Sequence, residues 1–328
     1  MRCAGGIFRL LCALLLIQAL PAQSLSGNST LDASERQRVL EKAVADLKLY
    51  YFDHDRAEKI ADALLAHERA GDYNSVTDRQ AFANVLVRDL IDASHDLHFT
   101  VEYTRNVFPD FSKPPPPDVQ SRYQSAMAHG NCGFEKIEIR LHNLGYLKLN
   151  SFAEVAVCQS KAESTMKALN HVDALIFDLR DNRGGNGNMA VFLAGFFFDH
   201  SEYMFDPREP VTEQNWTRSP VAGSLLMDKP LYILTSSRTY SAAEQFSYDL
   251  KMLKRATLVG ETTGGASHQG VLHNLDDHFA IGIPEHRPVN PYSDKDWAVA
   301  GVEPDVKVGA ADALAAGEKL AQRKLQKK

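Results

Sequence analysis

The stretch "TYSAAEQFSYDL", residues 239–250, contains a serine that admits two interpretations. Ser241 and Glu244 lie three residues apart, ahead of apolar residues at helical spacing, which is the pattern of a capping box. A hydroxyl at this position would lie beside the unpaired N–H groups and the positive end of the helix dipole. A serine placed there becomes a nucleophile once a base takes its proton. These residues alone leave helix cap and nucleophile both open.

Two glycine-rich loops add candidates for binding. In "ALIFDLRDNRGGNGN", residues 174–188, Gly184 and Gly185 follow a buried strand and can aim backbone N–H groups at an oxyanion. An ordinary strand-to-helix turn is the alternative. The loop "GETTGGASH", residues 260–268, follows another apolar run. We expect it either to line a peptide groove or simply to turn the chain, with candidate groove residues Thr262, Thr263, Gly264 and Gly265.

The stretch "HDLHFTVEY", residues 95–103, places two histidines beside an aspartate. His98 is a candidate base or metal ligand, and a polar histidine at a helix end is the alternative. A metal-dependent hydrolase built on His95, Asp96 and His98 would need a further ligand from elsewhere in the chain. We therefore predict no metal and no other cofactor.

The first 24 residues indicate export. Two arginines flank the start of an 11-residue apolar core, and "PAQS" follows, so we predict a secretory signal peptide over residues 1–24. The apolar run is too short to cross a bilayer, and the mature chain is expected to have no membrane span. Removal of the signal peptide leaves two cysteines, Cys132 and Cys158, which either form a disulfide or remain buried thiols. The net charge of −6 argues against a nucleic-acid partner.

The elements around these residues form two predicted domains. Three amphipathic helices are expected between residues 34 and 95, opening at Ser34, Asp55 and Thr77, so residues 25–105 are predicted to contain a small three-helix bundle. The proline-rich "FPDFSKPPPPDV" predicts a non-helical linker within residues 106–132. Alternating short apolar runs and helical stretches predict an α/β domain over residues 133–310, followed by a charged helix over 311–328.

The order of "DLHF", "GYLKLNSF", "DLRDNRGG", "SSRTYSAAE", "GETTGG" and "GVEPDV" resembles the carboxy-terminal processing (tail-specific) serine peptidase family. The likeness covers roughly residues 35–306 and is strongest to the tricorn-like and interphotoreceptor retinoid-binding-protein-like branch. It implies a crotonase-like (protease-core) α/β catalytic domain. It also implies that Ser241 is the nucleophile and His98 the general base. The amide of Ala242, with that of Gly184 or Gly185, resembles the oxyanion hole.

Two departures from the family pattern matter. Members with a Ser–Lys dyad carry the lysine in the loop corresponding to "GETTGGASHQG", which holds none here, so a histidine base becomes necessary. Relatives with a histidine often show Trp-Glu-Gly before the "GVEPDV"-like tail, where this chain has Ala298. The acid that orients the histidine is thus left open among Asp296, Glu303 and Glu244.

The resemblance implies a secreted or periplasmic serine endopeptidase that hydrolyses peptide bonds in peptides or unfolded proteins. Ser241, His98 and the glycine loop favour this interpretation. The alternative is a weak or inactive relative that binds a hydrophobic small molecule or peptide, which Ala298 favours. The substrate, the cleavage preference and the oligomeric state do not follow from the sequence.

Overall fold

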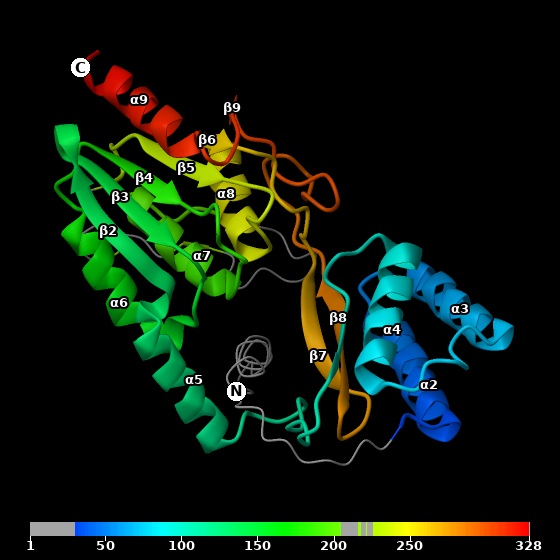
Figure 1. Cartoon of the computed structure of the whole chain (residues 1–328). Helices are drawn as coiled ribbons and strands as arrows, with labels where there is room; N and C mark the ends of the chain where they lie inside the picture. Colours follow the sequence, from blue (N-terminus) through cyan, green and yellow to red (C-terminus); the bar gives the residue numbers. More distant parts are fainter. Residues whose placement is uncertain (1–29, 205–215, 218–220, 222–225, 328) are drawn as a thin grey trace. The chain divides into compact units, whose positions relative to one another are not determined.

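The computed structural model describes residues 30–204, 216, 217, 221 and 226–327 (Figure 1). The predicted signal peptide lies outside these residues. The chain divides into two compact units. The first unit comprises Met1–Tyr123 and His268–Arg287, and the second comprises Gln124–Ser267 and Pro288–Lys328. None of the helices in the described residues combines the length and the apolarity that a membrane crossing requires.

Three helices of the first unit each begin after an aspartate. They are α2 (Ala33–Tyr50), α3 (His54–Ala70) and α4 (Arg79–Ser94). The carboxylates of Asp32, Asp53 and Asp78 accept backbone N–H groups of the first helical turn. The starts predicted at Ser34, Asp55 and Thr77 are therefore wrong by one or two residues, because in each case a neighbouring aspartate is the cap.

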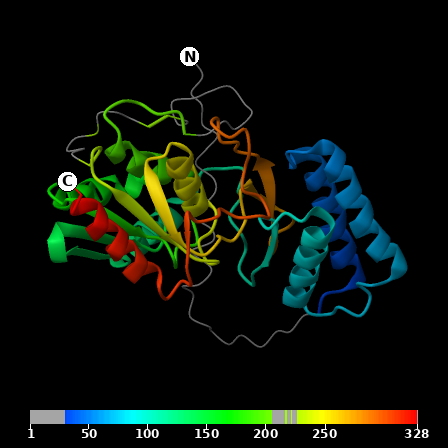
Figure 2. The same cartoon turned by 90° about the horizontal axis from the view of Figure 1, so that it is seen from above.

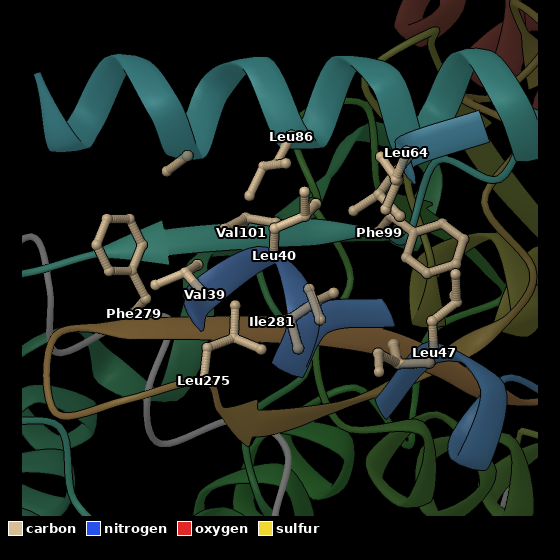
Figure 3. Close-up of a cluster of buried hydrophobic side chains, with 14 of the residues drawn as sticks. Val39, Leu40, Leu47, Leu64, Leu86, Phe99, Val101, Leu275, Phe279 and Ile281 are labelled. Carbon is tan, nitrogen blue, oxygen red and sulfur yellow. The ribbon is translucent and has the colours of Figure 1, made fainter. Parts of the chain in front are cut away.

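The first unit also contains a three-stranded antiparallel sheet. It contains β1 (Thr100–Tyr103), β7 (Gln269–Asn274) and β8 (Phe279–His286) in the order β1-β8-β7. Side chains of β8 and of the β7–β8 turn are buried among those of the helices (Figure 3). The labelled core residues are Val39, Leu40, Leu47, Leu64, Leu86, Phe99, Val101, Leu275, Phe279 and Ile281. The β7–β8 hairpin thus belongs with the helices, so residues 133–310 do not form the single domain predicted.

The proline-rich stretch runs into a helix rather than remaining irregular throughout. Helix α5 (Pro117–His129) begins at a proline, and Gln120 N–H donates to Pro116 O at 3.0 Å. Proline is tolerated in the first turn of a helix because its missing N–H would have no partner there. The prediction that residues 108–119 are not helical is therefore wrong for residues 117–119, where α5 begins.

The second unit is built on a six-stranded mixed sheet in the order β2-β3-β4-β5-β6-β9. Strand β2 runs antiparallel to β3, and the other neighbouring pairs are parallel. Strands β4 and β5 are buried at every position, as expected for strands covered on both faces. The bounds are β2 (Phe134–Arg140), β3 (Leu144–Leu149), β4 (Ala174–Asp178), β5 (Leu231–Thr235), β6 (Ala256–Gly260) and β9 (Val306–Lys307).

Helices cover both faces of this sheet (Figure 2). Ala313 and Ala321 of α9 (Ala313–Leu325) pack with Ile176 and Leu234, whereas the ring of Phe246 of α8 (Ala242–Met252) lies near that of Phe177 on the opposite face. The fold of this unit is therefore α/β, as predicted. The described residues also form α6 (Val155–Ala168), α7 (Gly187–Ala194), and the short 3₁₀ turns η2 (Asn131–Gly133), η3 (Leu141–Asn143) and η4 (Gly195–Phe197).

A disulfide joins Cys132 of η2 to Cys158 of α6. Of the two alternatives from the sequence, the structure therefore has the bonded pair. Both residues are buried within the second unit. The bridge ties the entry to β2 to the helix that follows β3.

Candidate active site

Ser241 lies at the turn between β5 and α8, with φ 52° and ψ −121°. A positive φ is uncommon for a residue with a side chain and typically costs about 1–3 kcal/mol. The conformation is held because Ser241 N–H donates to Glu244 Oε2 at 2.8 Å, while Glu244 N–H donates to Ser241 O at 2.8 Å. A sharp, strained strand-to-helix turn is the local geometry that presents a nucleophilic serine in hydrolases.

The glycine loop after β4 touches this turn directly. A Cβ on Gly184, whose φ is +96°, would lie 2.7 Å from Ser241 Cβ and 3.0 Å from Ala242 N. Gly184 N–H already donates to Asn182 Oδ1 at 2.8 Å, so this amide is occupied. Within the described part of the chain, neither Gly185 N–H nor Ala242 N–H has a protein acceptor. The predicted oxyanion donors thus reduce to Gly185 and Ala242.

Glu244 connects the turn of Ser241 to the second glycine-rich loop. Its buried carboxylate accepts Ser241 N–H and Ala266 N–H on Oε2, at 2.8 and 2.9 Å. The other oxygen accepts Gly265 N–H at 2.6 Å and the Thr263 hydroxyl at 2.5 Å. Burial raises the pKa of Glu244, and these four donors act against that rise. The carboxylate, with two donors on each oxygen, therefore holds the Ser241 turn and the second glycine-rich loop together within the second unit.

The predicted groove residues mostly bond to other segments of the second unit. Thr263 Oγ1 accepts Val302 N–H at 2.7 Å, and Gly264 N–H donates to Thr239 O at 2.9 Å. The carbonyl of Gly265 accepts Val299 N–H at 2.8 Å. These bonds fix the shape of the loop. A role in substrate binding for Thr262, Thr263, Gly264 and Gly265 stays a prediction.

The other two candidate acids also belong to the second unit. Glu303 is exposed and pairs with Lys307 at 3.0 Å. Asp296 is partly buried, and its Oδ1 accepts Ala298 N–H at 2.9 Å. His98, by contrast, belongs to the first unit. Orientation of His98 by Asp296, Glu303 or Glu244 stays a prediction.

Around His98, the first unit gathers a buried cluster of polar groups. Asp96 Oδ1 accepts His98 N–H at 3.1 Å, and Asp96 Oδ2 accepts the Tyr51 hydroxyl at 3.3 Å. Although part of His98 is exposed, burial of its ring lowers the pKa to about 4, with Asp96 opposing and His268 reinforcing the shift. Burial by itself would raise the pKa of Asp96, but the hydrogen bond from His268 holds it below its ordinary value.

The sequence reasoning did not single out His268, which ends the loop "GETTGGASH". Its Nδ1 lies 2.5 Å from Asp96 Oδ2. The signal that would have found it is the histidine at the end of a loop already singled out for its glycines. His95 is exposed and is the left-handed cap of α4, with φ 56°. No group of three or more His, Cys, Asp or Glu side chains in the described residues is placed to hold a metal ion.

Comparison with curated proteins finds processing proteases. The chain is 28% identical over 155 residues to a carboxyl-terminal-processing protease of Synechocystis, covering 45% of this chain and 36% of that protein. It is 30% identical over 166 residues to the carboxyl-terminal-processing peptidase 2, chloroplastic, of Arabidopsis thaliana, covering 49% and 31% respectively. The aligned region thus spans about a third of the length of each of these relatives.

Solved structures share the fold at low sequence identity. The photosystem II D1 C-terminal processing protease superposes with a TM-score of 0.51 at 14% identity, over 85% of this chain and 94% of that one. The tricorn protease gives a TM-score of 0.55 at 13% identity, over 90% of this chain and 37% of that one. These likenesses concern the fold alone.

Two protein-family models match separate parts of the chain. Residues 33–127 match the N-terminal domain of Peptidase_S41 in eukaryotic IRBP. Residues 143–308, half of the chain, match peptidase family S41 itself, and this segment contains both glycine-rich loops and Ser241. The chain therefore belongs to peptidase family S41.

Proposed function

We propose that the protein is an exported serine endopeptidase in which Ser241 is the nucleophile. The observation that carries the proposal is the backbone of Ser241, which has φ 52° at the first turn of α8 beside Gly184. A strained serine in contact with a glycine loop is costly to maintain, and hydrolases maintain it to present the hydroxyl. Membership of peptidase family S41 supports the same activity.

The geometry supports separate roles for the serine, a base and two backbone amides in acyl transfer. A base takes the Ser241 proton as its oxygen attacks the substrate carbonyl, and the developing oxyanion accepts hydrogen bonds from Ala242 N–H and Gly185 N–H. Loss of one such donor typically costs about 2.7–4 kcal/mol in transition-state stabilisation. The resemblance assigns the base to His98.

The proposal extends to the fold and the setting. We propose that the second unit has the crotonase-like topology and that α2, α3 and α4 form the predicted bundle. The Cys132–Cys158 disulfide supports an oxidising compartment, and hence the predicted signal peptide and a periplasmic or extracellular location. Relatives are named for processing carboxyl termini. We carry over only the general substrate class, a peptide or unfolded protein.

A fluorophosphonate probe tests the nucleophile on the full-length protein. We expect labelling at Ser241, located by peptide mass mapping, and none in Ser241→Ala. Ser237→Ala is the matched control, because Ser237 is an exposed serine just before the same helix, and it should label like the wild type. A folded wild-type protein that resists the probe would contradict the proposal.

A binding function is the second candidate. Ala298 stands where related enzymes carry a glutamate, so a weakened or inactive site that binds a hydrophobic small molecule or peptide is the alternative. Saturable binding of such a ligand by the unlabelled protein, with Ser241 inert to the probe, would favour it.

A further inference from the structure

Strand β2 lies at the edge of the six-stranded sheet, and β3 is its only partner among the described strands (Figure 1). We propose that β2 pairs antiparallel with β2 of a second copy of this chain, with Ile139 on the two-fold axis of the dimer. The two six-stranded sheets then form one continuous sheet. This inference goes beyond the proposed peptidase function and does not depend on it. Every residue that carries it lies in the second unit.

The free edge of β2 presents apolar side chains to solvent. Ile137, Ile139 and Leu141 are 36%, 56% and 82% exposed. Ile137 and Ile139 point to the same face of the sheet because side chains alternate along a strand, and Leu141 follows them in the turn η3. An edge strand also offers unpaired backbone N–H and C=O groups, so an exposed apolar edge favours pairing with another strand.

The charged side chains on the other face of β2 limit how two copies can pair. Lys136, Glu138 and Arg140 alternate in sign along the strand. With the axis at Glu138, two identical antiparallel strands place Glu138 opposite Glu138 and Lys136 opposite Arg140. Like charges that face each other in this way are destabilising. With the axis at Ile139, Glu138 instead lies opposite Arg140 of the second copy, and this pair occurs twice.

The axis at Ile139 therefore gives a square of alternating charges. Within one chain, Glu138 Oε2 already lies 3.1 Å from Arg140 Nη2. Pairing adds to each of these two residues a second neighbour of opposite sign, on the second copy. Such complementarity fixes the register of an interface and excludes wrong pairings more than it adds affinity. The charges thus select the register, and the apolar side chains on the other face contribute the affinity.

An axis at Ile137 also matches the charges, but the shape of the strand disfavours it. The pairing of β2 with β3 is irregular between Phe134 and Lys136, and an irregularity of this kind bends and twists a strand. This register also places the carboxylate of Glu135 opposite Ile139. The axis at Ile139 uses the regular end of β2 and places Ile137 opposite Leu141 of the second copy. It therefore buries the three exposed apolar residues against one another.

Arg140 is held in place before association. Its guanidinium lies over the ring of Tyr146, 4.6 Å from the ring centroid, and it pairs with Glu318 of α9 as well as with Glu138. A side chain that is already ordered loses little entropy when it binds. A hollow of about 530 Å³, lined by residues 138–141, 144, 318 and 322, borders the same end of β2 and leaves room for side chains of the second copy.

Sedimentation velocity of the full-length protein tests the dimer. We expect the wild type to dimerise within a concentration range of up to about 100 μM, where weak interfaces are populated. Ile139→Lys places two lysines opposite each other on the axis and removes two buried isoleucines, so the dissociation constant should rise about 100-fold or more. Leu49→Lys is the matched control, because Leu49 is 63% exposed on α2. It should dimerise like the wild type.

Disulfide trapping tests the register. All variants also carry Cys3→Ser and Cys12→Ser, so that the native disulfide holds the only other cysteines. Ile139→Cys places two thiols directly opposite each other, with Cβ atoms about 4.5–5.5 Å apart, and should give a covalent dimer on mild oxidation. Ile137→Cys is the control. Its two copies lie four residues apart along the paired strands, roughly 13 Å, which is too far for a disulfide.

Each other outcome would overturn the proposal. A wild type that stays monomeric over the whole concentration range excludes a second copy and leaves the edge to a different partner. A dimer that persists in Ile139→Lys, or a covalent dimer of Ile137→Cys in place of Ile139→Cys, contradicts the proposed pairing. If Ile139→Lys does not fold, Ile139→Thr keeps a β-branched side chain, and the dissociation constant should still rise about tenfold. The peptidase proposal is unaffected by these results, because labelling of Ser241 tests it separately.

Discussion

Single residues show where this chain accepts unfavourable conformations and charges. Ser241 keeps a positive φ although it carries a side chain, and Glu244 keeps a carboxylate in a buried position. In both cases hydrogen bonds from neighbouring backbone groups hold the arrangement. The energetic cost of each arrangement can therefore be measured as a change in the free energy of unfolding when a substitution removes the strain or the charge.

The strain at Ser241 predicts an order of stability between two inactive variants. Ser241→Gly and Ser241→Ala both lack the hydroxyl, but only glycine adopts positive φ without steric cost. Relief of about 1–3 kcal/mol of strain exceeds the extra chain entropy of an unfolded glycine, about 0.4–1 kcal/mol. We expect Ser241→Gly to be more stable than Ser241→Ala by about 1 kcal/mol in urea denaturation. A less stable glycine variant would mean that the backbone is relaxed there.

The buried Asp249 predicts a pH dependence of stability. Burial raises the pKa of Asp249 well above its ordinary value, although its Oδ1 accepts Asn290 Nδ2–H at 2.9 Å. The folded protein therefore holds a proton that the unfolded chain has released above about pH 4, so this contribution to stability is lost as the pH rises. Asp249→Asn removes the titration.

We expect the free energy of unfolding of Asp249→Asn, relative to wild type, to increase from pH 5 to pH 8. Chemical denaturation at several pH values measures it. Asp62→Asn on the exposed face of α3 is the control and should run parallel to the wild type. Parallel curves for Asp249→Asn as well would contradict the prediction.

At the scale of elements, the sequence located helices and strands better than their ends. Apolar periodicity identified α2, α3 and α4, but three nearby aspartates competed for the cap positions and decided the starts. The prolines of residues 114–117 predicted irregular chain, yet the last of them opens α5 because a first-turn proline loses no hydrogen bond. Such competition depends on local geometry that residue types alone do not fix.

The candidate site was predictable in part for a similar reason. Ser241 stands out by its spacing from Glu244 at the start of a helical pattern, and each glycine loop stands out because it follows an apolar run. The pairing of Asp96 with His268 joins positions 172 residues apart, and only the folded first unit brings them together. The occupied amide of Gly184 likewise depends on where the Asn182 side chain points.

The disulfide predicts how the second unit responds to reductant. Cys132 and Cys158 are 26 residues apart, and closing a loop of that length lowers the entropy of the unfolded chain enough to stabilise the fold by about 3 kcal/mol. We expect dithiothreitol to lower the free energy of unfolding by about that amount in urea denaturation. The double variant Cys132→Ser, Cys158→Ser is the control and should not respond. An equal response of wild type and control would contradict the prediction.

At the scale of the whole molecule, the chain passes between the units at residues 123–124, 267–268 and 287–288. The hairpin β7–β8 is flanked on both sides by sequence of the second unit, yet Phe279 and Ile281 are buried in the core of the first. Domains predicted as contiguous stretches of sequence cannot represent this arrangement. A hydrophobic pattern predicts a strand, but it does not predict the elements against which that strand packs.

Phe279→Ala tests whether the β7–β8 hairpin is part of the first unit. Phe279 is fully buried, and its ring lies near those of Phe82 and Tyr103, with centroids 6.2 and 5.2 Å away. Truncation should cost about 3–5 kcal/mol. We expect hydrogen exchange to show loss of protection first in α4 and β1.

Phe246→Ala is the matched control, because Phe246 is equally buried in the second unit. It should weaken protection first in β4 and α8. Early loss of protection in β4 for Phe279→Ala would contradict the placement of the hairpin.

The late position of this hairpin also bears on how the protein is made. His268 follows Ser94, the last residue of α4, by 174 residues in the sequence. At synthesis rates of about 5–20 residues per second, roughly 10–35 s pass between the release of the helices and that of the strand they need. During translation the nascent helices therefore expose an apolar face that β8 later fills, and a chaperone that shields this face would raise the yield of folded protein.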